Sequence, residues 1–401
     1  MTAEPAGLKP LFVALVNYNH YARFKTVESL LEHYYNLWGW GEGLTEAGAQ
    51  VRVFQRYYCD RRLRHGNLDV VLFHEYGPRL RGWQIPRRFH RTIAASCKTA
   101  SDAGSDVLVH LGGMVFPMQT RSLRRMLPKS CALVAQHHGE EPWTGIRGLL
   151  QRRAMRGVDG FLFTTEAHAE PWLDRGVIAS PNLVHTVMEG SSAFVAGPKT
   201  QARGTTDIQG DPAVLWTANL DANKDPLTLL DGFEKVLPSF PRARLSMAFR
   251  RDDLLKEVAQ RLAQSPALEG AVTLLGRIPR NRMAAYYQSA DLFVQGSHRE
   301  AAGLSMLDAM ACGAVPVVTD IPSFRVMTHH GRLGALWKAG DATDFERAFR
   351  QVMRQPLELQ RQAAIDYFEE HWSFAAIGRK AVGIYREVLE RSAKKRHNKS
   401  G

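Results

Sequence analysis

The chain has 401 residues, of which 45% are hydrophobic and 23% are charged. This length predicts two domains, and the composition excludes a largely disordered chain, a coiled coil and a collagen-like repeat. The four cysteines form no Cys-x-x-Cys pair, so we expect neither a disulfide framework nor a structural zinc site. The residues near Met1 do not resemble a secretion signal, and no apolar run is long enough to cross a bilayer, so we expect a cytoplasmic protein.

The net charge of +12 is distributed unevenly. Between residues 76 and 92 the chain carries five arginines and no acid: Arg79, Arg81, Arg87, Arg88 and Arg91. A second basic group surrounds Arg125, and the tail after Glu390 is basic as well. Such clusters fit nucleic acid, an anionic membrane surface or phosphate-bearing substrates, and they also occur on ordinary solvated surfaces. Charge alone does not choose between these interpretations.

Predicted strands alternate with predicted helices along the chain. Short apolar runs predict strands at 11–16, 51–54, 70–73, 107–111, 132–135, 160–163, 184–187, 213–217, 244–248, 272–275, 292–294 and 315–318. Helical patterns between the early strands cover 26–47, 87–100 and 144–156. Such alternation indicates an α/β fold with parallel sheets covered by helices on both faces.

A polar stretch rich in Gly and Thr interrupts the alternation near residue 200 and reads as a linker. We therefore predict two doubly wound Rossmann-like domains: residues 1–200, a linker at 201–210, residues 211–374, and a C-terminal helix with its basic tail at 375–401. Because open parallel sheets bind ligands at the carboxyl ends of their strands, we expect the functional residues in the loops that follow the strands.

The most informative of these loops lies in the stretch ADLFVQGSHREAAGLSMLDAMACGAVPVVTD at 290–320. A predicted strand leads into a loop and then into a helix at 304–312, which opens after Gly303. The unpaired N–H groups and the dipole of such a helix start favour a phosphate. Glu300 and Asp308 flank this start, and carboxylates beside a phosphate site are suited to sugar hydroxyls. The sequence contains no G-x-G-x-x-G after a strand, no P-loop, no H-E-x-x-H and no G-x-S-x-G.

This stretch resembles the carboxyl-terminal domain of the family 4 retaining glycosyltransferases, which have the GT-B fold. The family's pattern begins with S-x-x-E and a Gly-containing turn, which correspond here to Ser297 to Glu300 and to Gly303. A second acid follows eight positions after the first and is Asp308 in this chain. The segments A-M-A-C-G and P-V-V come next, at 309–313 and 316–318. Segments at 216–226, 274–279, 286–291 and 339–341 extend the resemblance in order. It covers about 211–345 strongly and the first domain in outline. It implies two Rossmann-like domains that face each other across a cleft.

The resemblance also implies a role for each matching residue. Lys224, as an unpaired ammonium, is expected to contact the donor diphosphate. Glu300 is expected to hold hydroxyls of the donor sugar, and Asp308 those of the ribose. The other expected donor-binding positions are Asn219, Arg277, Ile278, Ala302, Gly303 and Leu304. In the first domain, the family's histidine facing the donor sugar aligns best with His138 and next with His137, so the expected catalytic set is His138, Glu300 and Lys224.

Two positions depart from the family's pattern. Asn219 stands where the family has an arginine for the diphosphate, and an amide supplies no charge. Asp308 stands where the family has a glutamate, which is longer by about 1.5 Å. Both departures favour one alternative function, a catalytically silent GT-B scaffold in polysaccharide assembly. A nucleotide-sugar epimerase is a second alternative, because it too can use two Rossmann-like domains.

The function implied by the resemblance is a retaining, metal-independent glycosyltransferase of the hexosyltransferase type. Its substrate is expected to be a nucleoside-diphosphate sugar, with no cofactor, no metal and no nucleic-acid partner. Because the arginine-rich segment at 79–91 falls in the domain that usually faces the acceptor, we expect a saccharide or lipid-linked acceptor, of anionic character, and peripheral association with an anionic membrane at its inner face.

Overall fold

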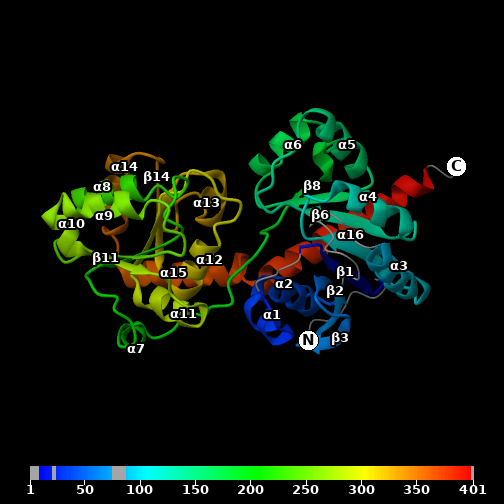
Figure 1. Cartoon of the computed structure of the whole chain (residues 1–401), viewed down its shortest axis with the longest axis horizontal. Helices are drawn as coiled ribbons and strands as arrows, with labels where there is room; N and C mark the ends of the chain where they lie inside the picture. The colour runs from blue at the N-terminus through cyan, green and yellow to red at the C-terminus, as the bar shows by residue number, and fades with distance from the viewer. Residues whose placement is uncertain (1–8, 20–23, 75–86, 399–401) are drawn as a thin grey trace. The chain divides into compact units, whose positions relative to one another are not determined.

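The computed structural model describes residues 9–19, 24–74 and 87–398. By its internal contacts the chain divides into two compact units, one made of residues 1–190 and 374–401 and the other of residues 191–373. Each unit is an α/β layer structure built on one sheet, which is parallel except for the edge strand β3 in the first unit and parallel throughout in the second (Figure 1). Two Rossmann-like units agree with the prediction from sequence. The facing of the two across a cleft stays a prediction.

The sheet of the first unit has eight strands in the order β3-β4-β2-β1-β5-β6-β7-β8. Their bounds are β1 Leu11–Asn17, β2 Ala49–Tyr57, β3 Arg61–His65, β4 Leu68–His74, β5 Asp106–Leu111, β6 Ala132–Gln136, β7 Gly160–Phe163 and β8 Val184–Thr186. Its helices are α1 Val27–His33, α2 Tyr35–Glu46, α3 Arg87–Asp102, α4 Pro117–Met126, α5 Gly145–Met155, η1 Glu166–His168, α6 Glu170–Asp174, η2 Pro181–Leu183 and α16 Phe374–His397. The neighbours of β1 are β2 and β5, so the direction of the strand order reverses between β1 and β5.

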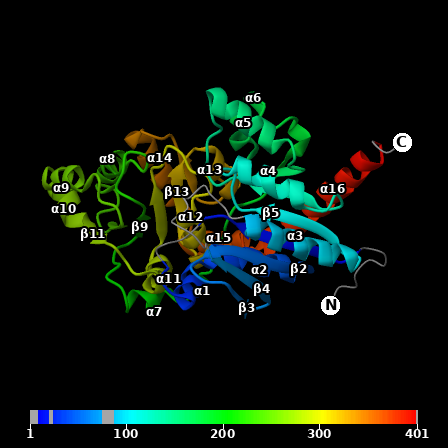
Figure 2. The same cartoon turned by 45° about the vertical axis from the view of Figure 1, so that its right-hand side comes forward.

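Helices cover this sheet because successive side chains of a strand point to opposite faces. Phe12, Ala14 and Val16 of β1 belong to one core with Phe89 of α3 and Leu123 of α4. In both views α3 and α4 lie beside each other over this face (Figures 1 and 2). The remaining residues of β1 face the other way, toward the layer that holds α2 and α16.

Helices α2 and α16 approach each other closely because glycines lie at their crossing. A Cβ atom added at Gly43 would lie 2.1 Å from the backbone oxygen of Phe374, and one added at Gly378 would lie 2.1 Å from the backbone oxygen of Gly43. Any side chain at these positions would force the helices apart. The C-terminal helix, which the sequence left without a partner, therefore packs into the first unit.

The sheet of the second unit has six parallel strands in the order β11-β10-β9-β12-β13-β14. Their bounds are β9 Ala213–Thr217, β10 Arg244–Ala248, β11 Val272–Gly276, β12 Leu292–Gln295, β13 Val315–Thr319 and β14 Ala335–Trp337. The helices are α7 Lys199–Arg203, α8 Pro226–Val236, α9 Leu255–Ala263, α10 Pro266–Ala271, α11 Arg280–Ser289, α12 Leu304–Cys312, α13 Pro322–Met327, α14 Ala342–Val352 and α15 Leu357–His371. This strand order is that of a Rossmann fold, with its switch point between β9 and β12.

Two layers of helices enclose this second sheet (Figure 1). Trp216 of β9 packs in one core with Phe233 of α8 and Phe349 of α14. On the other face, the ring of Tyr287 in α11 lies 6.3 Å from that of Phe293 in β12, centre to centre. Since both faces are covered, β9 to β13 consist largely of apolar residues, which is why the sequence predicted them, whereas β14, with three residues, was not predicted.

The segment expected as a linker, 201–210, differs from the prediction at its start. Residues 199–203 form the short helix α7, whose Lys199 and Arg203 both bind the carboxylate of Asp291, at 2.8 and 2.7 Å. Arg203 also donates to the backbone oxygen of Ser289, at 3.0 Å. The sequence did not predict this helix because it has no apolar stripe. Ion pairs instead attach the helix to the rest of the second unit.

Candidate nucleotide-sugar site

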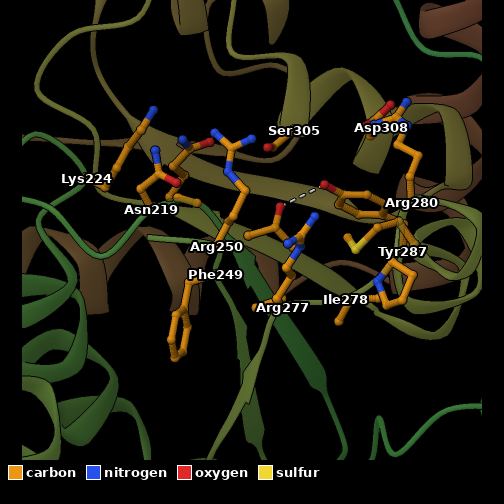
Figure 3. Close-up of a pocket in the computed structure, with 16 residues that line it drawn as sticks. Asn219, Lys224, Phe249, Arg250, Arg277, Ile278, Arg280, Tyr287, Ser305 and Asp308 are labelled. Atoms are coloured by element: carbon orange, nitrogen blue, oxygen red, sulfur yellow. Dashed lines mark hydrogen bonds and ion pairs between the residues drawn. The ribbon is translucent and has the colours of Figure 1, made fainter. Parts of the chain in front are cut away.

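A cavity of about 450 Å³ lies at the carboxyl ends of β9 to β12 in the second unit (Figure 3). The side chains around it come from the loops after these strands and from the first turns of α11 and α12. The polar and charged members of this lining are Thr217, Asn219, Lys224, Arg250, Arg277, Arg280, Tyr287, Gln295, Ser305 and Asp308. The cavity thus lies at the topological switch point, where a Rossmann sheet binds its ligand, and its volume suits a ligand of nucleotide size.

The structure places five of the residues expected to bind the donor in this lining: Asn219, Lys224, Arg277, Ile278 and Asp308. The expected residue Glu300 lies next to it, because its carboxylate pairs with the ammonium of Lys224. Ala302, Gly303 and Leu304 form the start of α12 and do not line the cavity themselves, whereas Ser305 does. The spacing of the sequence motif therefore brings one group of side chains together, although their roles stay predictions.

An ion pair joins Lys224 and Glu300 at this corner. Both side chains are mostly buried, with 16% and 13% of their surface exposed. Oε1 of Glu300 also accepts hydrogen bonds from Gln295, at 3.0 Å, and from Ser297, at 2.7 Å. The expectation of an unpaired Lys224 is therefore wrong for this structure. Within the described ranges all three contacts of Glu300 fall on Oε1, which leaves Oε2 for a hydroxyl.

Lys224 meets Glu300 because their two loops are tied together. Asn223 donates to the backbone oxygen of Arg299, at 3.0 Å, and accepts from its N–H, at 3.1 Å. The N–H of His298 donates to the backbone oxygen of Asn223, at 2.8 Å. These bonds fix the loop after β9 against the loop after β12, so the Lys224 ammonium has one predetermined position.

Asp308 is buried in the wall of the cavity and is held by two other side chains. Ser192 donates to its Oδ1, at 2.6 Å, and Arg280 donates to its Oδ2, at 3.0 Å. Burial raises the pKa of Asp308, and the charge of Arg280 and both hydrogen bonds oppose this rise. The guanidinium of Arg280 in turn lies over the ring of Phe194, 4.4 Å from its centre. Neither Ser192 nor Arg280 carries a signal in the sequence that marks it as a site residue.

The start of α12 requires a glycine. Gly303 is its N-cap residue with a φ of 72°, in the left-handed region that other residues rarely adopt. A Cβ atom here would also lie 2.5 Å from the ring of Phe324. Ser305, the second residue of the helix, lines the cavity, so the helix start and its first N–H groups lie at the cavity edge, which suits an anion.

The cavity carries an excess of positive charge. Four cationic side chains line it, Lys224, Arg250, Arg277 and Arg280, against one carboxylate, Asp308. Sequence reasoning missed Arg250, since only strand register shows that the loop after β10 ends at this cavity. With the helix start of α12 at its edge, the arrangement suits a ligand with at least two negative charges.

A second, smaller cavity of about 210 Å³ lies within the first unit, at the carboxyl ends of β1, β5 and β6. Its polar lining consists of Asn17, Asn19, Tyr34, Asn36, His110, Gln136, His138 and Glu189. This is the switch point of the first sheet, since the strand order reverses between β1 and β5. A lining rich in amide, hydroxyl and imidazole groups is suited to hydrogen bonding with a polar ligand.

His138, the histidine preferred from the sequence, lines this second cavity, and His137 does not. Nδ1 of His138 lies 3.0 Å from Oε2 of Glu189. Desolvation alone would lower the pKa of His138, but the hydrogen bond and charge of Glu189 and the charge of Glu140 raise it. His137 is instead buried, and its ring stacks on Phe163 at 4.9 Å between centres, which is a structural role.

A buried polar chain beneath this cavity escaped the sequence reasoning. Nδ1 of His110 lies 2.5 Å from the hydroxyl of Tyr385 in α16, and its Nε2 lies 3.0 Å from Oε1 of Gln136. Burial lowers the pKa of His110 to about 3, so its imidazole is neutral at physiological pH. Within the described ranges the Gln136 amide nitrogen lacks a hydrogen-bond partner, which leaves a buried donor at the cavity wall.

Comparison with known proteins places these features in context. Residues 199–369 match the sequence model described as glycosyl transferases group 1. A D-inositol 3-phosphate glycosyltransferase from Thermobispora bispora is 25% identical over 268 residues, which are 63% of this chain and 61% of that protein. Another from Pseudarthrobacter chlorophenolicus is 31% identical over 256 residues, 59% of this chain and 58% of that protein. The chain thus spans about three fifths of the length of these relatives.

Similarity among solved structures extends over both units. A sucrose-phosphate synthase from Thermosynechococcus elongatus superimposes with a TM-score of 0.63, covering 96% of this chain and 100% of that one, at 16% sequence identity. At this identity the likeness concerns the fold alone. It confirms the two-domain fold expected from the sequence resemblance.

Proposed function

Through residues 199–369 the chain belongs to the glycosyl transferases group 1 family, and from this premise we propose that it transfers a sugar from a nucleoside-diphosphate sugar to an acceptor. The proposed reaction is retaining and uses neither a metal nor a cofactor. The single observation that carries the proposal is the cavity at the switch point of the second sheet, lined by four cations and one acid. A nucleoside diphosphate is the leaving group whose charge such a lining complements.

The chemical problem in this reaction is the charge that develops on the leaving group. As the anomeric C–O bond breaks, its electron pair passes to the diphosphate, and fixed positive groups lower the energy of that state. Lys224 and the N–H groups at the start of α12 are the groups we propose for this task. The acceptor oxygen bonds to the anomeric carbon on the face that the diphosphate leaves, and its proton passes to the departing phosphate.

The acids are proposed to position the donor. Glu300, held through Oε1, keeps Oε2 for a hydroxyl of the donor sugar. Asp308, fixed by Ser192 and Arg280, is proposed to accept from the ribose hydroxyls. Arg277 and Ile278, in the loop after β11, are proposed to hold the nucleobase. In the first unit, His138 beside Glu189 is proposed to face the reacting sugar.

The test of this proposal is a turnover assay with UDP-, GDP- and ADP-sugars and a panel of acceptors. We expect one nucleoside diphosphate to be released in an acceptor-dependent manner, with a product whose anomeric configuration in the NMR spectrum equals that of the donor. An inverted product would contradict the retaining mechanism. Interconversion of the donor sugar without an acceptor would instead support an epimerase.

One further observation bears on the silent-scaffold alternative. Asn219 lines the cavity without a charge of its own, and both carboxylate oxygens of Asp308 already accept hydrogen bonds from the chain. A scaffold without activity would release no nucleoside diphosphate from any donor in the assay above.

For the acceptor side we propose an anionic or lipid-linked acceptor at an anionic membrane surface. Within the described ranges no helix is both long and apolar enough to span a bilayer, so the proposed association is peripheral. Helices α4 and α5, which pack together in the first unit, and the residues just before them expose large apolar side chains: Val115, Met118, Trp143, Ile146, Leu149 and Leu150. Exposed arginines accompany them, namely Arg125, Arg147 and Arg153. Apolar and basic groups on one surface are typical of proteins that bind the interface of an acidic bilayer.

One arginine of the basic segment noted in the sequence already has partners within the first unit. Arg88 pairs with Asp60 at 3.0 Å, and its guanidinium lies 4.4 Å from the centre of the Phe73 ring. Arg79 and Arg81 lie outside the described residues. The apolar side chains of α5 are therefore the better place to test membrane binding.

We expect replacement of both Ile146 and Leu149 by aspartate to reduce binding to vesicles that contain acidic lipid by about 10-fold or more. The reason is that each apolar side chain buried in the interface contributes about 1.5–3 kcal/mol, and the added acids are repelled. Co-sedimentation with vesicles measures the effect. Leu359→Asp is the matched control, since Leu359 is 70% exposed on α15 of the other unit. Equal binding by all three proteins, or binding insensitive to acidic lipid, would contradict the membrane proposal.

A further inference from the structure

Two of the four cations in the cavity of the second unit have no acidic partner among the residues that the structure describes. Lys224 pairs with Glu300 and Arg280 pairs with Asp308. For Arg250 and Arg277, by contrast, no ion pair with another described residue is formed. An exposed arginine without a partner at the rim of a cavity is available to an incoming anion.

Adjacent strands bring Arg250 and Asn219 to the same cavity. In the parallel pair of β9 and β10, Thr217 lies opposite Ala248, so Asn219 and Arg250 are each two residues beyond the same step of the ladder. Beyond the ladder the N–H of Ala218 donates to the Ala248 oxygen at 3.2 Å and the N–H of Leu220 to the Arg251 oxygen at 2.9 Å, so the loop after β10 contains one extra residue. Asn219 and Arg250 nevertheless both line the cavity. Neighbouring strands are about 4.8 Å apart, so a side chain at either position reaches the same part of the cavity.

The two unpaired arginines differ in their distance from the helix start of α12. In the strand order β11-β10-β9-β12, Arg250 follows β10 and is separated from β12 by β9 alone. Arg277 follows β11, the edge strand, and is one strand farther away. In Figure 3 the guanidinium of Arg250 points into the region between Asn219 and Ser305, whereas Arg277 lies below it. Of the two, Arg250 is therefore the one aimed at the anion site.

We infer that Arg250 is the second cation for the donor diphosphate and supplies from β10 the charge that Asn219 cannot supply from β9. This inference rests on the proposed function, since it assigns a residue to the diphosphate of that donor. The geometry requires no rearrangement of the sheet, because both side chains already line the same cavity from adjacent strands. Arg250 and Lys224 then bind the diphosphate together with the N–H groups of α12.

The test is a charge swap between the two positions, read by calorimetric binding of the nucleoside diphosphate that the wild-type chain binds best. Arg250→Ala is expected to weaken that binding about 10- to 100-fold, the range expected for one charge-assisted hydrogen bond. Adding Asn219→Arg to the Arg250→Ala variant is expected to restore the affinity to within about fivefold of the wild type, because the new guanidinium reaches the same region.

Arg251→Ala is the matched control, because Arg251 is the exposed neighbour whose side chain pairs with Asp253 instead of lining the cavity. It is expected to bind as the wild type does. Arg250 is itself exposed, so its truncation is not expected to disturb folding, and circular dichroism checks this. Unchanged affinity in Arg250→Ala, or no recovery in the double variant, would overturn the inference while the proposed function stands. A wild-type chain that binds no nucleoside diphosphate would instead overturn the proposed function.

Discussion

Replacing Lys224 by alanine is expected to lower the kcat of sugar transfer about 100-fold or more and to weaken binding of the nucleoside diphosphate as well. The ammonium is mostly buried and is held at one place by the loops after β9 and β12. A fixed positive charge of this kind stabilises the charge that develops on the leaving group, and removal of one such group typically costs a factor of about 100 to 1000 in kcat. Steady-state kinetics together with calorimetry measure both effects.

Two further variants separate the role of the charge from that of the ion pair. Glu300→Gln keeps a hydrogen-bonding group at the same place, so it is expected to lower kcat and leave the affinity for the nucleoside diphosphate almost unchanged. Lys235→Ala is the control, because Lys235 is an exposed lysine on α8, the helix that follows the Lys224 loop. The assignment would be wrong if Lys224→Ala turned over the donor as fast as Lys235→Ala.

The second large effect is expected from Gly303→Ala. An alanine here must adopt a φ of 72° and place its Cβ atom 2.5 Å from the Phe324 ring. Left-handed backbone and overpacking each cost about 1–3 kcal/mol, so we expect destabilisation of about 2–6 kcal/mol together with loss of donor binding. The unfolding temperature from calorimetry, with and without the nucleoside diphosphate, measures both consequences.

Gly340→Ala is the control that isolates the clash. Its φ of 76° is similar, but a Cβ atom there would have His298 as its nearest neighbour, at an ordinary 3.8 Å. It therefore carries the backbone strain without the overpacking. If both variants unfold at the same temperature, the start of α12 is not held by close packing against Phe324.

The sequence allowed most of the fold to be predicted because both sheets are buried on both faces. Such strands are apolar runs, and β1 and β13 are examples in which every residue is buried. Strand β3 was missed because it is an exposed antiparallel edge strand of sequence RRLRH, with no apolar run to find. The predicted helix at 26–47 is two helices, α1 and α2, since Tyr34 leaves the helical region with a ψ of 48°.

Site residues that are close together in the sequence could be predicted. Site residues that only the pairing of distant strands brings together could not. Glu300, Gly303 and Asp308 lie on one strand–loop–helix unit, so their spacing alone placed them. Arg250 is 31 positions after Asn219, and only the pairing of β9 with β10 brings both to one cavity. Likewise, the contact of His110 with Tyr385 joins residues that are 275 positions apart. Such contacts depend on tertiary packing that no local pattern contains.

The central claim is that the cavity of the second unit binds the diphosphate of a nucleotide, and its most direct test is calorimetric titration of the wild-type chain. The titration uses UDP, GDP and ADP, and each is compared with its monophosphate and its nucleoside. This comparison separates the contribution of the second phosphate to the affinity from that of the base. We expect one diphosphate to bind about 10- to 100-fold more tightly than its monophosphate, with an affinity that falls as salt is added. Equal affinity for the diphosphate, the monophosphate and the nucleoside, or no binding of any diphosphate, would contradict the account.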